Sequence, residues 1–300
     1  LAAGLQARWL QGLRGLAAVL AVALLFGVAV SLAFSQFRLL IPFATPLIAL
    51  ALATFGHVSY QVVVEQREKK LIRQTFQQYV APSVVDKMLS LGELPSFGGE
   101  RKELSVLFSD IRNFTRFSEA HEPEVVAARL SEYLSEMVEI IFRQGGTLDK
   151  FVGDAIMAIY GAPYYFEDHA ERACRTALEM QQRLKELQKG WPDEPFARFN
   201  IGVGINTGKM IVGNLGSRQL FDYTVIGDEV NLASRLEGAN KEYETGIIIS
   251  ESTCRQISAK ALVRELDLVR LVGRSQAIRI YELRSMDALP QLEQDYLIDL

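Results

Sequence analysis

Long apolar runs without any charge mark the start of the chain, and shorter apolar runs separated by polar residues fill the rest. Residues 15–34 and 39–64 contain no Asp, Glu, Lys or Arg. A helix needs about 20 apolar residues to cross the hydrocarbon core of a bilayer, and neither run has the polar face that a helix on a soluble core would show. The pattern therefore predicts two transmembrane helices over these residues, within a membrane region at 1–64.

Basic residues flank both predicted helices. By the positive-inside rule such flanks lie in the cytoplasm, so we expect a multi-pass protein of the cell inner membrane, in contact with membrane lipid, whose remaining residues are cytoplasmic. The chain begins with Leu rather than Met, and we expect a sensor domain upstream of it. The flanking residues are Arg8 and Arg14 before the first helix, and Arg67, Lys69, Lys70 and Arg73 after the second.

Residues 65–99 differ from the membrane region, because charged and glutamine residues alternate there with a few apolar positions. We expect a helical connector that breaks at Ala81–Pro82, since a residue before proline avoids helical geometry. The spacing of Val64 and Leu71 leaves two forms open, a short coiled coil and a single amphipathic helix.

From residue 100 onwards, the apolar positions switch between the period of a strand and that of a helix. They predict the order strand, helix, hairpin, helix, strand, which is the order of a ferredoxin-like α+β core. We place this core at 100–284 and a C-terminal tail at 285–300. The expected strands are 104–109, 148–151, 155–159, 199–205, 210–212, 223–226, 246–250, 263–271 and 277–283. The expected helices are one whose first turn is 111–114, then 123–143, 169–188 and one capped by Asp228.

Composition excludes several classes of function. The net charge is −4, and residues 1–64 hold three arginines and no acidic residue, so the rest of the chain is more acidic still. An acidic domain argues against a nucleic acid as partner. The two cysteines, Cys174 and Cys254, have no metal-binding spacing, which argues against a zinc site.

Two aspartates stand where apolar runs end, Asp110 after Leu104–Ser109 and Asp154 after Lys150–Gly153. Aspartates at strand ends are also common turn formers. Two hard oxygen ligands without Cys or His suit Mg²⁺ or Mn²⁺, and two such ions commonly serve a polyphosphate. The start of a helix after Asp110 would direct free N–H groups at a phosphate. Together these features predict a site for a triphosphate and two metal ions.

Four motifs of the chain resemble those of a known family. The segments Phe108–Thr115, Lys150–Ala155, Gly204–Gly208 and Tyr223–Arg235 resemble the class III nucleotidyl cyclases. The resemblance covers about residues 100–284. It implies the cyclase fold and an adenylate cyclase, a phosphorus–oxygen lyase that converts ATP to 3′,5′-cyclic AMP and pyrophosphate for intracellular signalling.

The resemblance also implies roles for individual residues. Lys150 and Thr224 would read the purine, because a lysine donor matches adenine N1 and a threonine oxygen can accept from the adenine amino group. Asn231 and Arg235, four residues apart, share one face of a helix; Asn231 would position the ribose and Arg235 would stabilise charge on the α-phosphate. The implied metal ligands are Asp110, Ile111 and Asp154, and the implied triphosphate contacts are Ile111, Asn113, Phe114 and Thr115.

In this family one subunit supplies the metal ligands and the other supplies the purine, ribose and arginine contacts. One chain holds both halves here, so the resemblance implies a head-to-tail homodimer with two equivalent sites. Val272 departs from the family, which usually has a lysine that contacts the triphosphate there; Arg270 and Arg274 are candidate substitutes. Two alternatives remain, a weakly active or inactive signalling scaffold, favoured by Val272, and a guanylate cyclase, opposed by Lys150.

Overall fold

The computed structural model describes residues 98–191, 199–217, 221–257, 260–270 and 277–286, and separate positions between 21 and 84. The chain divides into two units, Leu1–Pro95 and Ser96–Leu300. The predicted connector at 65–99 lies almost wholly outside the described residues, as do Val272 and Arg274 and most of the predicted tail.

The first unit corrects the prediction for the membrane. Its described residues are helical. A bilayer requires about 20 apolar helical residues, and in the described part of the chain no helix is both long and apolar enough to cross one. The prediction of two transmembrane helices, and with it a multi-pass protein of an inner membrane, is therefore wrong for the residues that the structure describes.

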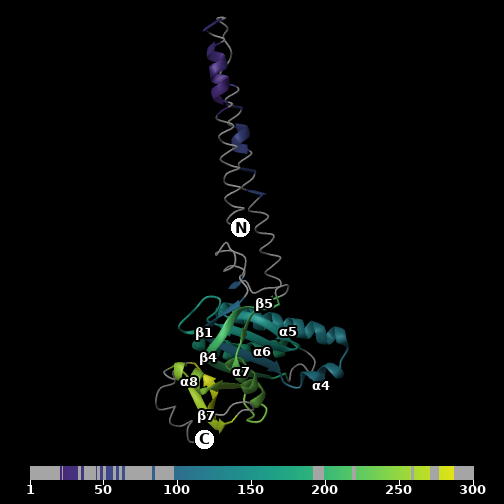
Figure 1. Ribbon diagram of the computed structural model, residues 1–300. Coiled ribbons are helices and arrows are strands. Elements are labelled where there is room, and N and C mark those ends of the chain that lie inside the picture. Colours follow the sequence, from purple (N-terminus) through teal and green to yellow (C-terminus); the bar gives the residue numbers. More distant parts are fainter. Residues whose placement is uncertain are drawn as a thin grey trace. The chain divides into compact units, whose positions relative to one another are not determined.

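The second unit is built on one eight-stranded sheet, which Figure 1 shows with its helices. The strand order is β2-β3-β1-β4-β6-β8-β7, and β5 pairs with β4. Only the β4–β6 pair is parallel among these neighbours. The strands are β1 (Gly98–Ile111), β2 (Thr147–Val152), β3 (Ala155–Tyr160), β4 (Ile201–Gly216), β5 (Phe221–Ile226), β6 (Ile247–Ser250), β7 (Leu262–Val269) and β8 (Ile278–Ser285).

Five helices of the second unit are described: α4 (Phe114–Glu119), α5 (Pro123–Arg143), α6 (His169–Gly190), α7 (Asp228–Ala239) and α8 (Glu251–Ile257). The prediction of an α+β fold is confirmed. The chain order β1, α5, β2, β3, α6, β4 and the sheet order β4-β1-β3-β2 are those of a ferredoxin-like core.

The core forms on both faces of β1, because successive side chains of a strand point to opposite faces. Leu107 lies in a buried cluster with residues of α5 and α6 such as Tyr133 and Ala173. Leu104 and Val106 lie in a second buried cluster that includes α7 residues. Asp110 is an even number of residues from Leu104 and Val106, so its side chain points to the same face of β1 as theirs. This is the face toward α7, at the point where β1 ends.

Gly204 lets α7 approach β4 closely. A Cβ atom at Gly204 would lie 2.2 Å from the backbone nitrogen of Glu237 and 2.3 Å from the carbonyl oxygen of Ala233. We expect Gly204→Ala to lower the free energy of unfolding by about 3 kcal/mol, because backbone atoms must move apart. The matched control is Gly238→Ala in α7, where a Cβ atom meets nothing within 4 Å; it should be neutral or stabilise by about 0.5–1 kcal/mol. Urea unfolding measures both, and equal stabilities would contradict the close packing.

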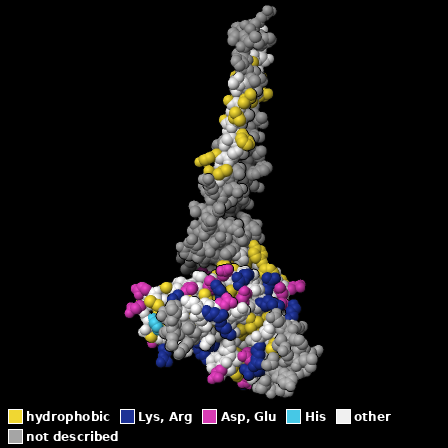
Figure 2. Space-filling view, turned by 180° about the vertical axis from the view of Figure 1, so that it is seen from behind, with side chains coloured by type: hydrophobic (Ala, Val, Ile, Leu, Met, Phe, Trp, Pro, Cys, Tyr) yellow, Lys and Arg dark blue, Asp and Glu magenta, His cyan; other side chains and the backbone are white. Residues whose placement is uncertain are grey.

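Figure 2 shows one face of the second unit, on which acidic and basic side chains are interspersed. Charged side chains of this unit form ion pairs along a helix, as between Arg175 and Glu171, or between helices, as between Arg183 and Glu136. Exposed pairs of this kind contribute about 0–1 kcal/mol each, so the stability of this unit rests on its buried apolar clusters.

Candidate active site

Asp110 and Asp154 meet at one end of the sheet. Asp110 is the penultimate residue of β1, and Asp154 lies in the turn between β2 and β3. Strands β1 and β3 pair antiparallel, with Ser109 opposite Ile156, which brings the turn to the end of β1. The Ile111 backbone N–H donates a hydrogen bond to Asp154 Oδ2 at 3.2 Å. Pairing in the sheet therefore joins two carboxylates that are 44 positions apart in the chain.

The two carboxylates interact strongly. The pKa of Asp154 is raised to about 6, first by partial burial and then by the charge of Asp110 and a hydrogen bond with it. Like charges held together disfavour ionisation, and a bound cation would relieve this repulsion. The electrostatics of the pair thus fit a cation site.

The donor set also fits the predicted metal ions. Mg²⁺ is commonly held by one or two carboxylates together with phosphate oxygens of a substrate. The Ile111 side chain is a buried hydrocarbon without a ligand atom, and its N–H donates to Asp154, so only its backbone carbonyl can serve as a ligand. Among the residues that the structure describes, no three His, Cys, Asp or Glu side chains gather as a metal cluster.

The turn after Asp110 differs from the prediction. The sequence suggested a helix from Ile111, but β1 continues through Ile111 and α4 begins at Phe114. The reason is that the Ile111 N–H donates to Asp154 and the Arg112 N–H donates to the Asn200 carbonyl oxygen, the latter at 2.8 Å. These bonds hold Ile111 in β1 and Arg112 in the turn that follows.

The predicted triphosphate contacts lie at this turn. Asn113 precedes α4 in the left-handed conformation, with φ 60°. Asn113 and Thr115 are exposed. The Phe114 ring packs against Phe117 and Phe199, with ring centroids 6.0 and 6.4 Å away, so Phe114 can offer a ligand only its backbone N–H. The first N–H groups of a helix lack partners within it.

Lys150 on β2 and Thr224 on β5 come together through a residue that sequence reasoning missed, Asp149. The Thr224 hydroxyl donates to Asp149 Oδ2 at 2.6 Å, and Lys150 Nζ lies 3.3 Å from Asp149 Oδ1. Burial raises the pKa of Asp149, while the Thr224 hydrogen bond and the Lys150 charge lower it. No local sequence pattern predicts this contact, because Thr224 lies 75 residues from Asp149 in the chain.

Asn231 and Arg235 lie on the exposed surface of α7. Within the described residues neither side chain makes a hydrogen bond or ion pair, so both are available to a ligand. The expected N-cap at Asp228 is corrected: Gly227, with φ 145°, is the N-cap, and Asp228 is the first helical residue. The carboxylate still favours the helix, because the N-terminus is the positive end of the helix dipole.

An ion pair that sequence reasoning also missed joins β1 to α7. Arg112 Nη1 lies 3.5 Å from Glu237 Oε1, and Arg112 Nη2 donates to the Glu237 carbonyl oxygen at 3.3 Å. Burial, followed by the charge of Asp110, raises the pKa of Glu237 to about 7, and Arg112 opposes this. Gly202 leaves room for the Arg112 guanidinium, because a Cβ atom at this position would lie 2.0 Å from Arg112 Nη2. Helix α7 is thereby fastened to the residue that follows the candidate metal ligands.

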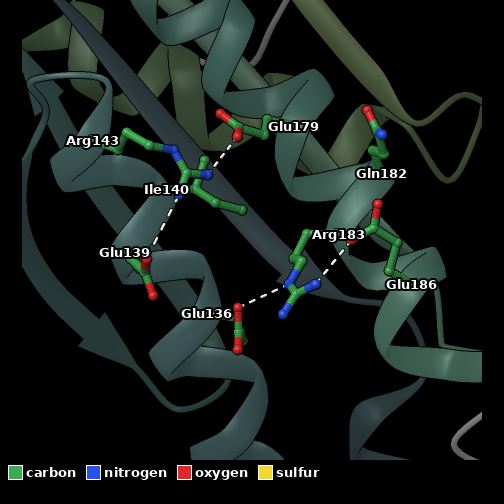
Figure 3. A pocket seen from close by; sticks show the side chains of 8 residues that line it. All are labelled: Glu136, Glu139, Ile140, Arg143, Glu179, Gln182, Arg183 and Glu186. Carbon is green, nitrogen blue, oxygen red and sulfur yellow. Dashed lines mark hydrogen bonds and ion pairs between the residues drawn. The ribbon is translucent and has the colours of Figure 1, made fainter. Parts of the chain in front are cut away.

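A separate hollow of about 330 Å³ lies on α5 and α6 (Figure 3). Both of its arginines are paired: Arg143 with Glu139 and Glu179, and Arg183 with Glu136 and Glu186. None of the predicted site residues lines it, and the ion pairs account for its charged groups. Its lining residues are Glu136, Glu139, Ile140, Arg143, Glu179, Gln182, Arg183 and Glu186.

Comparisons with known proteins identify the family. The family described as the adenylate and guanylate cyclase catalytic domain matches residues 99–285. Adenylate cyclase 1 of Rhizobium meliloti is 37% identical over 209 residues, which are 70% of this chain and 31% of that protein. The chain thus spans about a third of that relative's length.

Two solved structures are also similar. The adenylyl cyclase CyaB from P. aeruginosa has 39% identity and a TM-score of 0.58, over 62% of this chain and 96% of that one. The guanylyl cyclase Cya2 has 36% identity and a TM-score of 0.58, over 62% and 94%. The chain belongs to the adenylate and guanylate cyclase catalytic domain family, and the predicted membership of the class III nucleotidyl cyclases is confirmed.

Proposed function

We propose that this chain carries the catalytic domain of an adenylate cyclase, which converts ATP to 3′,5′-cyclic AMP and pyrophosphate for signalling. The observation that carries the proposal is the meeting of Asp110 and Asp154 at the end of β1, in a chain that belongs to a cyclase family. In the reaction the ribose 3′-oxygen bonds to the α-phosphorus while the bond to the pyrophosphate oxygen breaks.

Asp110, Asp154 and the Ile111 carbonyl would hold Mg²⁺ or Mn²⁺, two ions per site. When bound, such ions lower the pKa of the attacking hydroxyl and neutralise charge on the triphosphate. The carboxylates must be ionised to act as ligands. The turn at Asn113–Thr115 would direct its free N–H groups at the phosphates, as the N-terminal groups of helices do.

Asn231 and Arg235 would act from α7. Arg235 presents a rigid fork of N–H donors that suits phosphate oxygens, and it would stabilise negative charge that develops on the α-phosphate. Asn231 would hold the ribose so that its 3′-oxygen faces the phosphorus. Their exposure and their lack of partners among the described residues support both roles.

The choice of ATP over GTP rests on Lys150 and Thr224. Similar structures include both an adenylyl and a guanylyl cyclase, so structural similarity alone does not identify the base of the substrate nucleotide. Lys150 can only donate and the Thr224 oxygen can accept, a pair that matches the N1 atom and the amino group of adenine.

We further propose that two copies of the chain form each site. Metal ligands would come from one copy, and Lys150, Thr224, Asn231 and Arg235 from the other. A head-to-tail dimer then has two equivalent sites. The position of Val272, a departure from the family, lies outside the described residues, and Arg270 is exposed just before it.

The test is to incubate the purified chain with Mn²⁺ and either ATP or GTP and to identify the product. Cyclic AMP from ATP, with much less cyclic GTP from GTP, is the expected result. Addition of excess EDTA should abolish it. No cyclic nucleotide from either substrate, in a preparation shown to be dimeric, would refute the proposal.

Binding of Mn²⁺ should strengthen as the pH rises through about 6, because protons and the cation compete for the Asp154 carboxylate, whose pKa is about 6. Calorimetric titration at about pH 5 and about pH 8 measures this change. Without metal, the effect of a rise in pH has the opposite sign: it lowers the stability of the folded chain. A carboxyl whose folded pKa exceeds its unfolded value of about 3.9 makes the free energy of unfolding fall as the pH rises from about 4 to about 6. Equal Mn²⁺ affinities at the two pH values would contradict the assignment of Asp154.

A further inference from the structure

Asp149 is a buried carboxylate that contacts both side chains proposed to read the base, and it also accepts a hydrogen bond from the Val225 backbone N–H. Its side chain is 0% exposed, whereas that of Lys150 is 41% exposed. Oδ2 accepts the Thr224 hydrogen bond, and Oδ1 faces Lys150 Nζ at 3.3 Å. A buried charge is costly unless it is paired, so the position of Asp149 calls for an explanation.

A local irregularity of β2 directs Asp149 to this place. The pairing of β2 with β3 runs from Leu148 opposite Ala158 to Lys150 opposite Met157, and Asp149 is the extra residue between them. Neighbours in a regular strand point to opposite faces. A bulge re-aims a side chain, and here Asp149 and Lys150 lie against each other although they are adjacent in sequence.

We propose that Asp149 is a positioning residue that makes the site selective for adenine; this inference rests on the proposed function. The Thr224 hydroxyl hydrogen is committed to Asp149, so the Thr224 oxygen retains only lone pairs and can only accept. Lys150 only donates, and its ion pair with Asp149 holds it in place. The site therefore offers one donor beside one acceptor.

Adenine and guanine present opposite groups to this pair. Adenine offers an acceptor at N1 and a donor at its 6-amino group, which match Lys150 and Thr224. Guanine offers a donor at N1 and an acceptor at O6, which mismatch both. A Thr224 hydroxyl that was free to rotate could donate to O6, so the hydrogen bond to Asp149 is what excludes this arrangement.

The main test is Asp149→Asn, assayed with ATP and GTP. The amide keeps the shape of the carboxylate, but its NH₂ group can donate to Thr224 and so release the hydroxyl hydrogen for guanine O6. We expect the ratio of kcat/KM for ATP to that for GTP to fall about tenfold, which is about 1.4 kcal/mol. If Asp149 only fastened β2 to β5, both substrates would lose activity equally and the ratio would not change.

A double-mutant cycle shows whether Asp149 acts through Thr224. Thr224→Val removes the hydroxyl, and Asp149→Asn should have no further effect on the ratio in that background, because groups that act as a unit are not additive. Thr224→Ser keeps the hydroxyl and should keep the ratio. If Asp149→Asn does not fold, as judged by circular dichroism, the proposal requires the ratio to fall in Thr224→Val and to persist in Thr224→Ser.

The proposed function and this inference fail in different ways. Selectivity for adenine is also measured without catalysis, as the ratio of the dissociation constants of 3′-deoxy-GTP and 3′-deoxy-ATP, which cannot cyclise. A wild-type chain that binds but does not cyclise either nucleotide counts against the proposed function alone. An unchanged binding ratio in Asp149→Asn, or an undiminished effect in the Thr224→Val background, overturns the role of Asp149.

Discussion

Replacement of Asp110 or Asp154 by Ala is expected to reduce cyclic AMP formation to background. Each change removes a carboxylate from a pair that the structure holds together, and a single lost electrostatic group at a reacting centre typically costs a factor of about 100–1,000 in kcat. Mn²⁺ binding measured by calorimetry should be lost in parallel. Near-normal activity of either variant would refute the metal site.

The two variants should differ in stability, which separates loss of a ligand from loss of fold. Asp110→Ala removes a charge that disfavours ionisation of Asp154, so without metal it should unfold no more easily than the wild type. Asp154→Ala leaves the Ile111 N–H without its acceptor and should cost about 1–3 kcal/mol. The matched control is Asp222→Ala, an exposed carboxylate on β5, which should change neither activity nor stability.

Chains that carry Asp110→Ala and chains that carry Arg235→Ala should restore activity when they are mixed. Each variant alone is expected to be inactive, since both of its sites are defective. In an equal mixture, about half of the dimers contain one copy of each, and each of these has one intact site and one with both defects. Activity should therefore recover to about a quarter of the wild-type value.

This recovery is measured after a step that permits exchange, such as mild dilution and reconcentration. Mixed dimers are verified by two different affinity tags. Absence of recovery in a pool that contains mixed dimers would exclude a shared site, whereas mixtures of Asp110→Ala with Asp154→Ala should stay inactive, because both changes lie in the same half of the site.

Much of this arrangement follows from local sequence. The apolar run Leu104–Ser109 predicts a strand, and it places Asp110 where that run ends. The four motif segments indicate the family, which the comparisons confirm. The α+β order is set by apolar periodicity, because each helix and strand must bury one side.

Contacts between distant segments escaped prediction. Asp149 meets Thr224 across 75 residues, and Arg112 meets the Glu237 carbonyl across 125; neither has a local pattern. The start of α4 was misplaced because backbone bonds to Asp154 and Asn200 extend β1. The membrane prediction relied on the apolar runs at 15–34 and 39–64 and on their basic flanks, and in the described part of the chain no helix is long and apolar enough to cross a bilayer.

The Arg112–Glu237 pair gives the proposed dimer a property that neither of its sites has alone. Within one chain, this pair connects the strand of the metal ligands to the helix of Asn231 and Arg235. In the dimer those two elements would belong to different sites. A shift of β1 when one site binds metal and nucleotide would then move α7 in the other. Because such coupling is reciprocal, saturation with ATP should be cooperative. The Hill coefficient would then measure how strongly the Arg112–Glu237 ion pair couples the two sites.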